Sequence, residues 1–278
     1  MKIVSSGKGI HSPEFHKKKR REQTVRLVVA LLFVVVFVAI PIYLLKTKRF
    51  LISSVEVRGN SVTKTEEIEQ IIKDKIIGNY LWIFPRSNDL LYPKGEIKNT
   101  LFQNIPRLSA ITVSLSNPNL ISISVEERKP FALYCVDTLN LNNPTGCFFL
   151  DKTGYIFSEA PAISGGVYFV YTNEPVFDLP LRQSLLNPNR FSEVSSFVGS
   201  LSSIGLSPKV FIDKGDEFNL VLPNGATVMW KSSANLDTIH SDLESFLSDP
   251  NFIKENNALQ RILYIDLRFG NKVFYKFK

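Results

Sequence analysis

The chain has 278 residues, enough for two ordinary domains with a further segment left over. Hydrophobic residues make up 44% of it, which excludes a disordered protein. Residues 1–26 hold eight basic and two acidic residues, and they account for +6 of the net charge of +7. The basic balance therefore belongs to a tail. It excludes a nucleic-acid-binding face, which would need Lys and Arg clustered on a folded surface.

An apolar run without a charge follows this tail, from Leu27 to Leu45. As a helix it spans about 28 Å, close to the ~30 Å hydrocarbon core of a bilayer, and Tyr43 suits the interface. A buried core helix rarely has so long a run. A cleaved signal peptide has a shorter run followed by small residues, where this chain has Lys-Thr-Lys. The pattern predicts a retained transmembrane helix at residues 27–45.

The flanking charges predict the orientation of this helix. Eight basic residues precede it, five of them contiguous from Lys17 to Arg21. The positive-inside bias places residues 1–26 in the cytoplasm. The rest of the chain is then expected outside it, periplasmic or extracellular, as the body of a single-pass protein of the plasma (inner) membrane. Each tail cation near an anionic leaflet would add about 1 kcal/mol of secondary anchoring.

Residues 50–130 predict a small β-α-α-β-β domain, because two stretches of helical periodicity lie between stretches that alternate polar and apolar residues. The first helix is expected to begin with a capping box from Thr63 to Glu66. The second should begin near Lys94, because Pro93 and Gly95 disfavour an earlier start. The expected elements are strand 50–59, helices 63–77 and 89–104, and strands 110–116 and 120–127.

Residues 131–278 predict a mostly antiparallel β domain with two packing helices, so the whole chain is of the α+β class. Asn224-Gly225 is the strongest hairpin signal, and Gly270-Asn271 predicts a last hairpin. Segments 79–93 and 158–190 show no pattern that predicts regular structure. The helices are expected at 191–204 and 236–247, and the strands at 131–136, 147–150, 155–157, 167–171, 210–213, 217–222, 227–231, 261–269 and 272–278.

The sequence offers no catalytic, cofactor or metal site. Two of its three histidines lie in the tail, which leaves nothing for a histidine-based triad or metal cluster. His240 is interpreted as a helix-surface residue and not a ligand, and Glu126 and Glu127 face opposite sides of a strand. We therefore expect a protein that is not an enzyme and has no small-molecule substrate. A membrane-tethered hydrolase would need an acid/base pair in a pocket of the folded surface.

Cys135 and Cys147 flank an insertion with Gly and Pro, one on each of two expected strands. If the body lies outside the cytoplasm, a disulfide between them can persist. It would close a loop of roughly 13 residues, for which chain-entropy arguments give about 3 kcal/mol. Two buried free thiols are the alternative.

The final expected strand, 272–278, is rich in aromatic residues and ends the chain. If its outer side is an exposed edge, it is a template onto which a partner can add a strand. The alternative is a protected edge, because Lys272, Lys276 and Lys278 are common blockers of unwanted pairing.

The β-α-α-β-β order directly after a membrane helix resembles the polypeptide-transport-associated (POTRA) domain. The resemblance rests on Ile52, Val55, Val57, Gly59 and Asn60, on Asn-Ile-Pro-Arg-Leu at 104–108 and on Val-Glu-Glu-Arg-Lys-Pro at 125–130. In the second unit, Phe-Leu-Asp-Lys-Thr-Gly-Tyr-Ile-Phe at 149–157 and Ile-Leu-Tyr-Ile-Asp-Leu-Arg-Phe at 262–269 resemble the β domain of the bacterial division family FtsQ/DivIB. The two cysteines and the insertion at 140–146 depart from that family.

This resemblance implies a non-catalytic scaffold at the division septum, with small bitopic partners of the FtsB and FtsL kind and no nucleic acid. The partners would bind at the end of the β domain. On matching positions the contact residues would be Phe269, Gly270, Asn271, Lys272, Val273, Phe274 and Tyr275. The alternative function is an anchored translocation or envelope-assembly factor that uses the POTRA-like unit as a polypeptide-binding chaperone.

Overall fold

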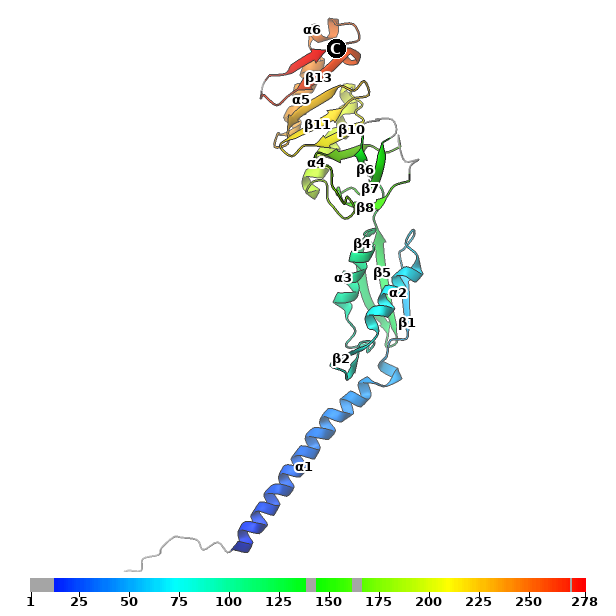
Figure 1. Cartoon of the computed structure of the whole chain (residues 1–278), viewed down its shortest axis with the longest axis vertical. Coiled ribbons are helices and arrows are strands. Elements are labelled where there is room, and N and C mark those ends of the chain that lie inside the picture. The colour runs from blue at the N-terminus through cyan, green and yellow to red at the C-terminus, as the bar shows by residue number, and fades with distance from the viewer. Residues whose placement is uncertain (1–12, 139–143, 162–166, 271) are drawn as a thin grey trace, which may run out of the picture. The chain divides into compact units, whose positions relative to one another are not determined.

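The computed structural model describes residues 13–138, 144–161, 167–270 and 272–278. They form two compact units (Figure 1). The first holds the residues up to Leu101 together with Ile111–Val125. The second holds Phe102–Ala110 and Glu126–Lys278, so that one end of a long hairpin packs with the second unit. The expected boundary lies at residue 130, whereas the two compact units divide the residues of this hairpin between them.

The first unit opens with the helix α1, Pro13–Leu45, followed by a short 3-10 turn, η1, Lys48–Phe50. From Lys17 onward α1 is long and apolar enough to cross a membrane, and its most apolar window is not buried inside the protein. A helix that is apolar all round and exposed in water would be unstable, so lipid is the solvent that fits it.

The rest of the first unit is a three-stranded sheet in the order β1-β5-β4 with two helices. Strand β1 runs parallel to β5, with Val55 opposite Ile121 and Val57 opposite Ile123. Buried isoleucines of α2, Ile68 among them, contribute side chains to the core of this unit. The strand and helix order agrees with the β-α-α-β-β expectation. The elements are β1 Ser54–Arg58, α2 Thr65–Ile76, α3 Lys94–Asn104, β4 Leu108–Asn117 and β5 Leu120–Glu127.

A two-stranded hairpin lies between the helices, in a stretch for which the sequence predicts no structure. Its strands, β2 Asn79–Tyr80 and β3 Phe84–Pro85, pair antiparallel.

The second unit is built on a nine-stranded sheet in the order β14-β13-β12-β11-β10-β9-β6-β7-β8. Strand β9 is parallel to both β6 and β10, and β12 is parallel to β13. The other pairs are antiparallel, so the sheet is mostly antiparallel, as the sequence predicts. The strands are β6 Ala132–Asp137, β7 Thr145–Leu150, β8 Ile156–Glu159, β9 Val170–Asn173, β10 Val210–Asp213, β11 Glu217–Val221, β12 Thr227–Lys231, β13 Ile262–Asp266 and β14 Phe274–Phe277.

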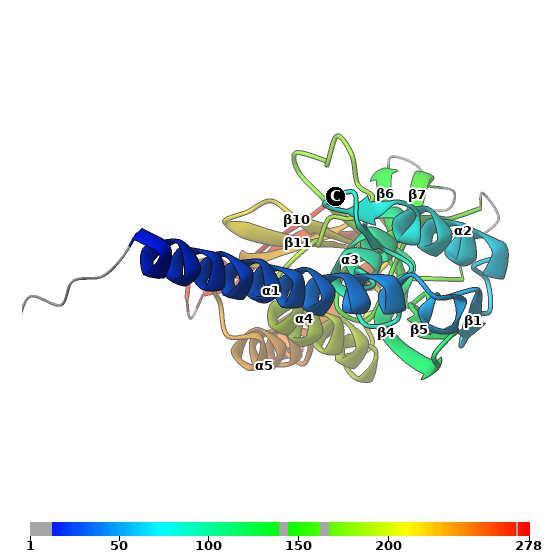
Figure 2. The same cartoon turned by 90° about the horizontal axis from the view of Figure 1, so that it is seen from below.

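Two helices, α4 Pro188–Ser200 and α5 Leu236–Leu247, lie side by side against this sheet (Figure 2). Asn187 and Asn235 cap them through their side-chain oxygens. Shorter helical segments accompany them: η3 Leu201–Ile204, α6 Pro250–Lys254 and α7 Ala258–Arg261. A large aromatic core lies beneath, and its fully buried side chains include Trp230, Tyr171, Phe191, Phe211 and Phe218.

Candidate functional site

Strand β14 forms one edge of the nine-stranded sheet. Its inner side pairs antiparallel with β13, with Tyr275 opposite Ile265 and Phe274 opposite Asp266. Among the described residues, no strand pairs with its outer side. The outer side of β14, called the open edge below, therefore presents backbone groups that the sheet does not use.

A charged cluster fixes the chain where it leaves β13. The Arg268 guanidinium lies 2.9 and 2.7 Å from the two carboxylate oxygens of Asp266 and 2.5 Å from Glu217 Oε2 on β11. The bonds from Arg268 hold the pKa of Asp266 below its usual range. This cluster ties β13 to β11 across β12, so the loop that leads to β14 starts from a fixed point.

The two faces of β14 have different surroundings. Tyr275 packs against Phe246 at the end of α5, with ring centroids 5.0 Å apart. Phe277 stacks on Phe252 of α6 at 6.2 Å. On the other face Phe274 meets only Phe269 among the described rings, at 5.4 Å, and these two side chains are 48% and 58% exposed. The strand is thus held by aromatic packing on one face and presents an apolar pair on the other.

The backbone of β14 has a definite polarity. The Lys278 N–H donates to the Arg261 carbonyl at 2.8 Å, toward the β13 side. Successive N–H groups of a strand point to opposite sides. The N–H groups of Tyr275 and Phe277 therefore point to the open edge.

The lysines of this segment do not all guard the edge. Lys278 Nζ donates to the Asn224 carbonyl at 2.8 Å, which ties this side chain to the β11–β12 turn. Lys272 and Lys276 are exposed. Of the three lysines expected to protect the edge, Lys278 is therefore held against the β11–β12 turn.

The structure brings most of the expected contact residues together around this edge. Phe274 and Tyr275 lie on β14, and Phe269 and Gly270 precede it in the turn, where Gly270 takes a positive φ of 67°. Lys272 is exposed and Val273 packs partly against the core. Asn271 lies outside the described residues.

Cys135 on β6 and Cys147 on β7 face each other in register and are joined by a disulfide. Residues 139–143 of the segment between them lie outside the described residues. The pair lies in the part of the sheet farthest in strand order from β14. That the bond forms in the living cell stays a prediction.

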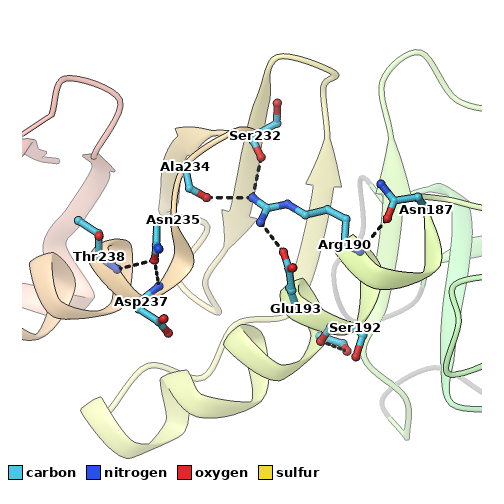
Figure 3. Close-up of polar contacts among 10 residues, drawn as sticks. Asn187, Arg190, Ser192, Glu193, Ser232, Ala234, Asn235, Asp237 and Thr238 are labelled. Atoms are coloured by element: carbon cyan, nitrogen blue, oxygen red, sulfur yellow. Dashed lines mark hydrogen bonds and ion pairs between the residues drawn. The ribbon is translucent and has the colours of Figure 1, made fainter.

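A cleft of about 620 Å³ between α4 and α5 is the place where a hydrolase site would be sought. Figure 3 shows Arg190, one of its lining residues, reaching from α4 toward the loop that precedes α5. Its guanidinium donates to the carbonyls of Ser232 and Ala234 and to Glu193, at 2.6, 3.1 and 2.8 Å. Asn235 accepts from the backbone of the first turn of α5. These polar contacts join helices to the loop between β12 and α5, and they serve the fold.

His240 also lines this cleft. Among the described residues, no hydrogen bond links its ring to a hydroxyl or a carboxylate, which a nucleophile and base pair would require. The part of the chain that is described likewise holds no group of three or more His, Cys, Asp or Glu suited to a metal ion. The hydrolase alternative gains no support from the cleft.

Comparison with known families identifies the first domain. Residues 50–128 match the family of the POTRA domain, FtsQ-type. No protein of curated function matches the chain at a significant level. The predicted POTRA resemblance is therefore confirmed for residues 50–128. The matched range ends before β6, so the argument for the open edge rests on its geometry.

The FtsQ-type domain, together with the N-terminal apolar helix, fits an FtsQ/DivIB-type protein. Such a domain supports a general role as a membrane scaffold in cell division, in a family known as non-catalytic. The apolar helix indicates single-pass anchoring.

Proposed function

We propose that this FtsQ/DivIB-type chain is a non-catalytic scaffold that receives an extended segment of another division protein on the open edge of β14. The partner is of the FtsB/FtsL kind, and it binds outside the cytoplasm at the division septum. The observation that carries the proposal is the unpaired outer side of β14, beside an exposed pair of aromatic rings.

Strand addition explains how such an edge binds. A partner segment would accept hydrogen bonds from the N–H groups of Tyr275 and Phe277, and each such bond contributes about 0.5–1.5 kcal/mol. Alternate side chains of the partner would lie beside Phe274 and Phe269, which adds apolar burial to the backbone bonds. Specificity then comes from the side chains and affinity from the main chain.

The charges favour a particular kind of segment. Lys272 and Lys276 are exposed on the binding segment. A second copy of β14 would bring like charges together, which is destabilising in paired strands. A segment with Asp or Glu at the facing positions would be favoured. The lysines thus block self-pairing and select an acidic partner.

A backbone test separates strand addition from ordinary side-chain contact. Tyr275→Ala removes the ring that packs on Phe246 but keeps the outward N–H. Tyr275→Pro removes the ring and the N–H together, and an edge strand tolerates proline where the N–H is not in the ladder. We expect both variants to lose similar stability, measured by thermal unfolding. We expect the proline variant to bind a partner peptide about tenfold more weakly than the alanine variant, on the order of 1.4 kcal/mol.

Equal binding by the two variants would show that the outer N–H is not used. Deleting residues 272–278 provides a second test, because it should abolish capture of the partner. Retained capture with a folded remainder would contradict the proposal.

The place of the protein in the cell distinguishes the two candidate functions. A fluorescent fusion of the full chain should accumulate at midcell if the chain is a division scaffold. An even envelope signal would favour the translocation or assembly alternative. Protease added to intact spheroplasts should degrade the folded body and spare residues 1–26, because the basic tail is placed inside by the positive-inside bias. A protected body would refute the orientation.

A further inference from the structure

The β2–β3 hairpin presents two large apolar side chains to the outside. Leu81 and Trp82 are 79% and 94% exposed. They occupy the two central positions of a turn closed by the bond from the Ile83 N–H to the Tyr80 carbonyl, at 3.0 Å. Their φ angles are 47° and 65°, the left-handed region that Asn and Gly enter more easily. Asn-Gly would adopt this turn with less conformational strain than Leu-Trp. The presence of Leu and Trp therefore indicates that exposure of these two side chains has a function.

The base of this hairpin is held firmly. The Arg86 N–H donates to the Gly78 carbonyl at 3.0 Å, and its guanidinium pairs with Glu96 and lies 5.0 Å from the centre of the Tyr80 ring. The tip is therefore presented by a fixed support.

The hairpin lies beside the C-terminal end of α1, within the same unit (Figure 1). Asn88, three residues after β3 and fully buried, donates through its side chain to the Leu45 carbonyl at 2.9 Å. Two backbone bonds reinforce this, from Ile52 to the Ser87 carbonyl and from Asp89 to the Phe50 carbonyl. Trp82 is six residues from Asn88, so its Cα lies within about 22 Å of the Cα of Asn88 even if the chain were extended.

Further exposed apolar side chains gather in the same stretch. Between residues 50 and 125, every large exposed hydrophobic side chain except Val62 falls within residues 77–91. Besides the two at the tip they are Ile77, Ile83, Leu90 and Leu91. A surface of this kind in a soluble domain marks a contact with a partner or a membrane. This surface lies in the same unit as the exposed apolar helix α1, whose last residue is bonded to Asn88 within the same stretch.

We propose that Leu81 and Trp82 insert into the interface of the same bilayer that α1 spans, on the side where the folded body lies. Trp is favoured at the level of the lipid headgroups because its ring is apolar and its N–H is polar. Lys46, Lys48 and Arg49 follow α1 directly and suit the phosphate layer at the same depth. The hairpin gives the POTRA domain a second attachment, so the domain cannot swivel freely about residues 46–50. The inference requires that α1 crosses the bilayer, and it is independent of what binds β14.

The test uses the full chain in nanodiscs of phosphatidylcholine and phosphatidylglycerol, with tryptophan fluorescence as the readout. The chain has two tryptophans, and Trp230 is fully buried in the core of the second unit. The difference between the wild type and Trp82→Phe therefore isolates the emission of Trp82. Acyl chains brominated near the carbonyl end should remove most of this difference, and acrylamide in the buffer should quench it little. The emission left in Trp82→Phe should respond to neither quencher, which makes Trp230 an internal control.

Two outcomes would overturn the proposal. If acrylamide quenches Trp82 freely and brominated lipid does not, the tip stays in water. If neither quenches it, protein covers the tip, for example a second copy of the chain. Thermal unfolding of Trp82→Phe should match the wild type, because the ring makes little contact with the rest of the domain. Capture of the partner on β14 should be unchanged in Trp82→Phe, so failure here is distinguishable from failure of the strand-addition proposal.

Discussion

The two edges of the nine-stranded sheet are treated differently by the same chain. Strand β8 forms the edge opposite β14, and residues 182–185 bond to its first residue, Ile156, and to the turn just before it. The Ile156 N–H donates to the Gln183 carbonyl and the Arg182 N–H donates to the Ile156 carbonyl, both at 2.8 Å. We call β8 with residues 182–185 the covered edge. At β14, no described residue plays the part of this segment.

This difference indicates at which edge of the sheet another chain can add a strand. An edge strand with free backbone groups is a hazard in solution, and the chain reduces that hazard at the start of β8 with its own backbone, while Arg107 bonds to the side chain of Ser158 farther along the strand. Among the described residues no such cover lies at β14, where the strand is instead held from one face by Phe246 and Phe252. An open edge in a sheet whose opposite edge is partly covered is more informative than an open edge alone.

The strongest way to break the covered edge is Asp151→Ala. This buried carboxylate lies at the turn before β8 and accepts bonds from Thr153 and from the Tyr155 N–H, and it pairs with Arg128. Removing it takes the carboxylate partner from the largely buried Arg128 guanidinium, whose Nε still donates to the Pro106 carbonyl, and it takes the acceptor from Thr153 and from the Tyr155 N–H. We expect a loss of about 3–5 kcal/mol in the free energy of unfolding, measured by urea titration. Asp216→Ala, at an exposed carboxylate, is the matched control and should change stability by less than about 0.5 kcal/mol. A loss of that small size at Asp151 would contradict the structure of this turn.

Reduction of the Cys135–Cys147 disulfide should have the next largest effect. The bond closes a loop with a sequence separation of 12 in the covered half of the sheet. Chain-entropy arguments give about 3 kcal/mol for a loop of this size. We expect the reduced protein to unfold at lower urea, with partner binding at β14 unchanged when both forms are folded. Two alkylated cysteines in protein purified without reductant would show that the bond is absent.

Acid should weaken both halves of the sheet. Burial alone would raise the pKa of Asp151, but the bonds from Thr153, Arg128 and Tyr155 outweigh it and hold this pKa below its usual value. Arg268 does the same for Asp266 beside the open edge. A carboxyl whose pKa is lower in the folded state stabilises the fold above its unfolded pKa of about 3.9, and this stability is lost as the pH falls through the folded value.

We therefore expect the free energy of unfolding to fall as the pH is lowered from about 5. Asp266→Asn should flatten this dependence, and Asp213→Asn should not, because burial raises the pKa of Asp213 and gives it the opposite sign. If the free energy of unfolding of Asp266→Asn fell with pH as it does in the wild type, the bonds between Arg268 and Asp266 would not form in solution.

Local chemistry predicts much of the element pattern. Asn224-Gly225 predicts the hairpin between β11 and β12, and Gly225 takes the positive φ that such a turn needs. Pro93 correctly delays α3 to Lys94. The capping box at Thr63 is wrong, because α2 begins at Thr65 and its cap residue, Lys64, makes no side-chain bond. The amide of Asn60 reaches the Thr63 carbonyl and the Thr65 hydroxyl instead, and this arrangement depends on the turn after β1.

Hydrophobic periodicity does not predict the features that distinguish the two proposed functional surfaces. The segment that covers the start of β8 lies within residues 158–190. Its conformation depends on backbone bonds to residues 154–156, and no local sequence pattern predicts such bonds. The β2–β3 hairpin has two-residue strands, too short to alternate, and its turn residues contradict ordinary turn preferences. The β14 edge could be anticipated from its aromatic residues and lysines. Its openness could not, because that depends on the strand order of the whole sheet.

The smallest expected effect concerns the contacts of Arg107 with Ser158 and Phe157 on β8, called the side-chain lock below. Arg107 donates to the Ser158 hydroxyl at 2.8 Å and lies 5.1 Å from the centre of the Phe157 ring. Arg107→Ala should cost about 1–2 kcal/mol through loss of both contacts, and Ser158→Ala about 0.5–1.5 kcal/mol through loss of the bond. The double variant should cost less than the sum, with a coupling near 1 kcal/mol.

A coupling of zero would mean that the side-chain lock does not form in solution. The covered edge would then rest on its backbone bonds alone, and a strand could compete for it if residues 182–185 opened. A measurable coupling has the opposite consequence. It would show that side chains as well as backbone groups hold β8, whereas no described residue covers the outer side of β14.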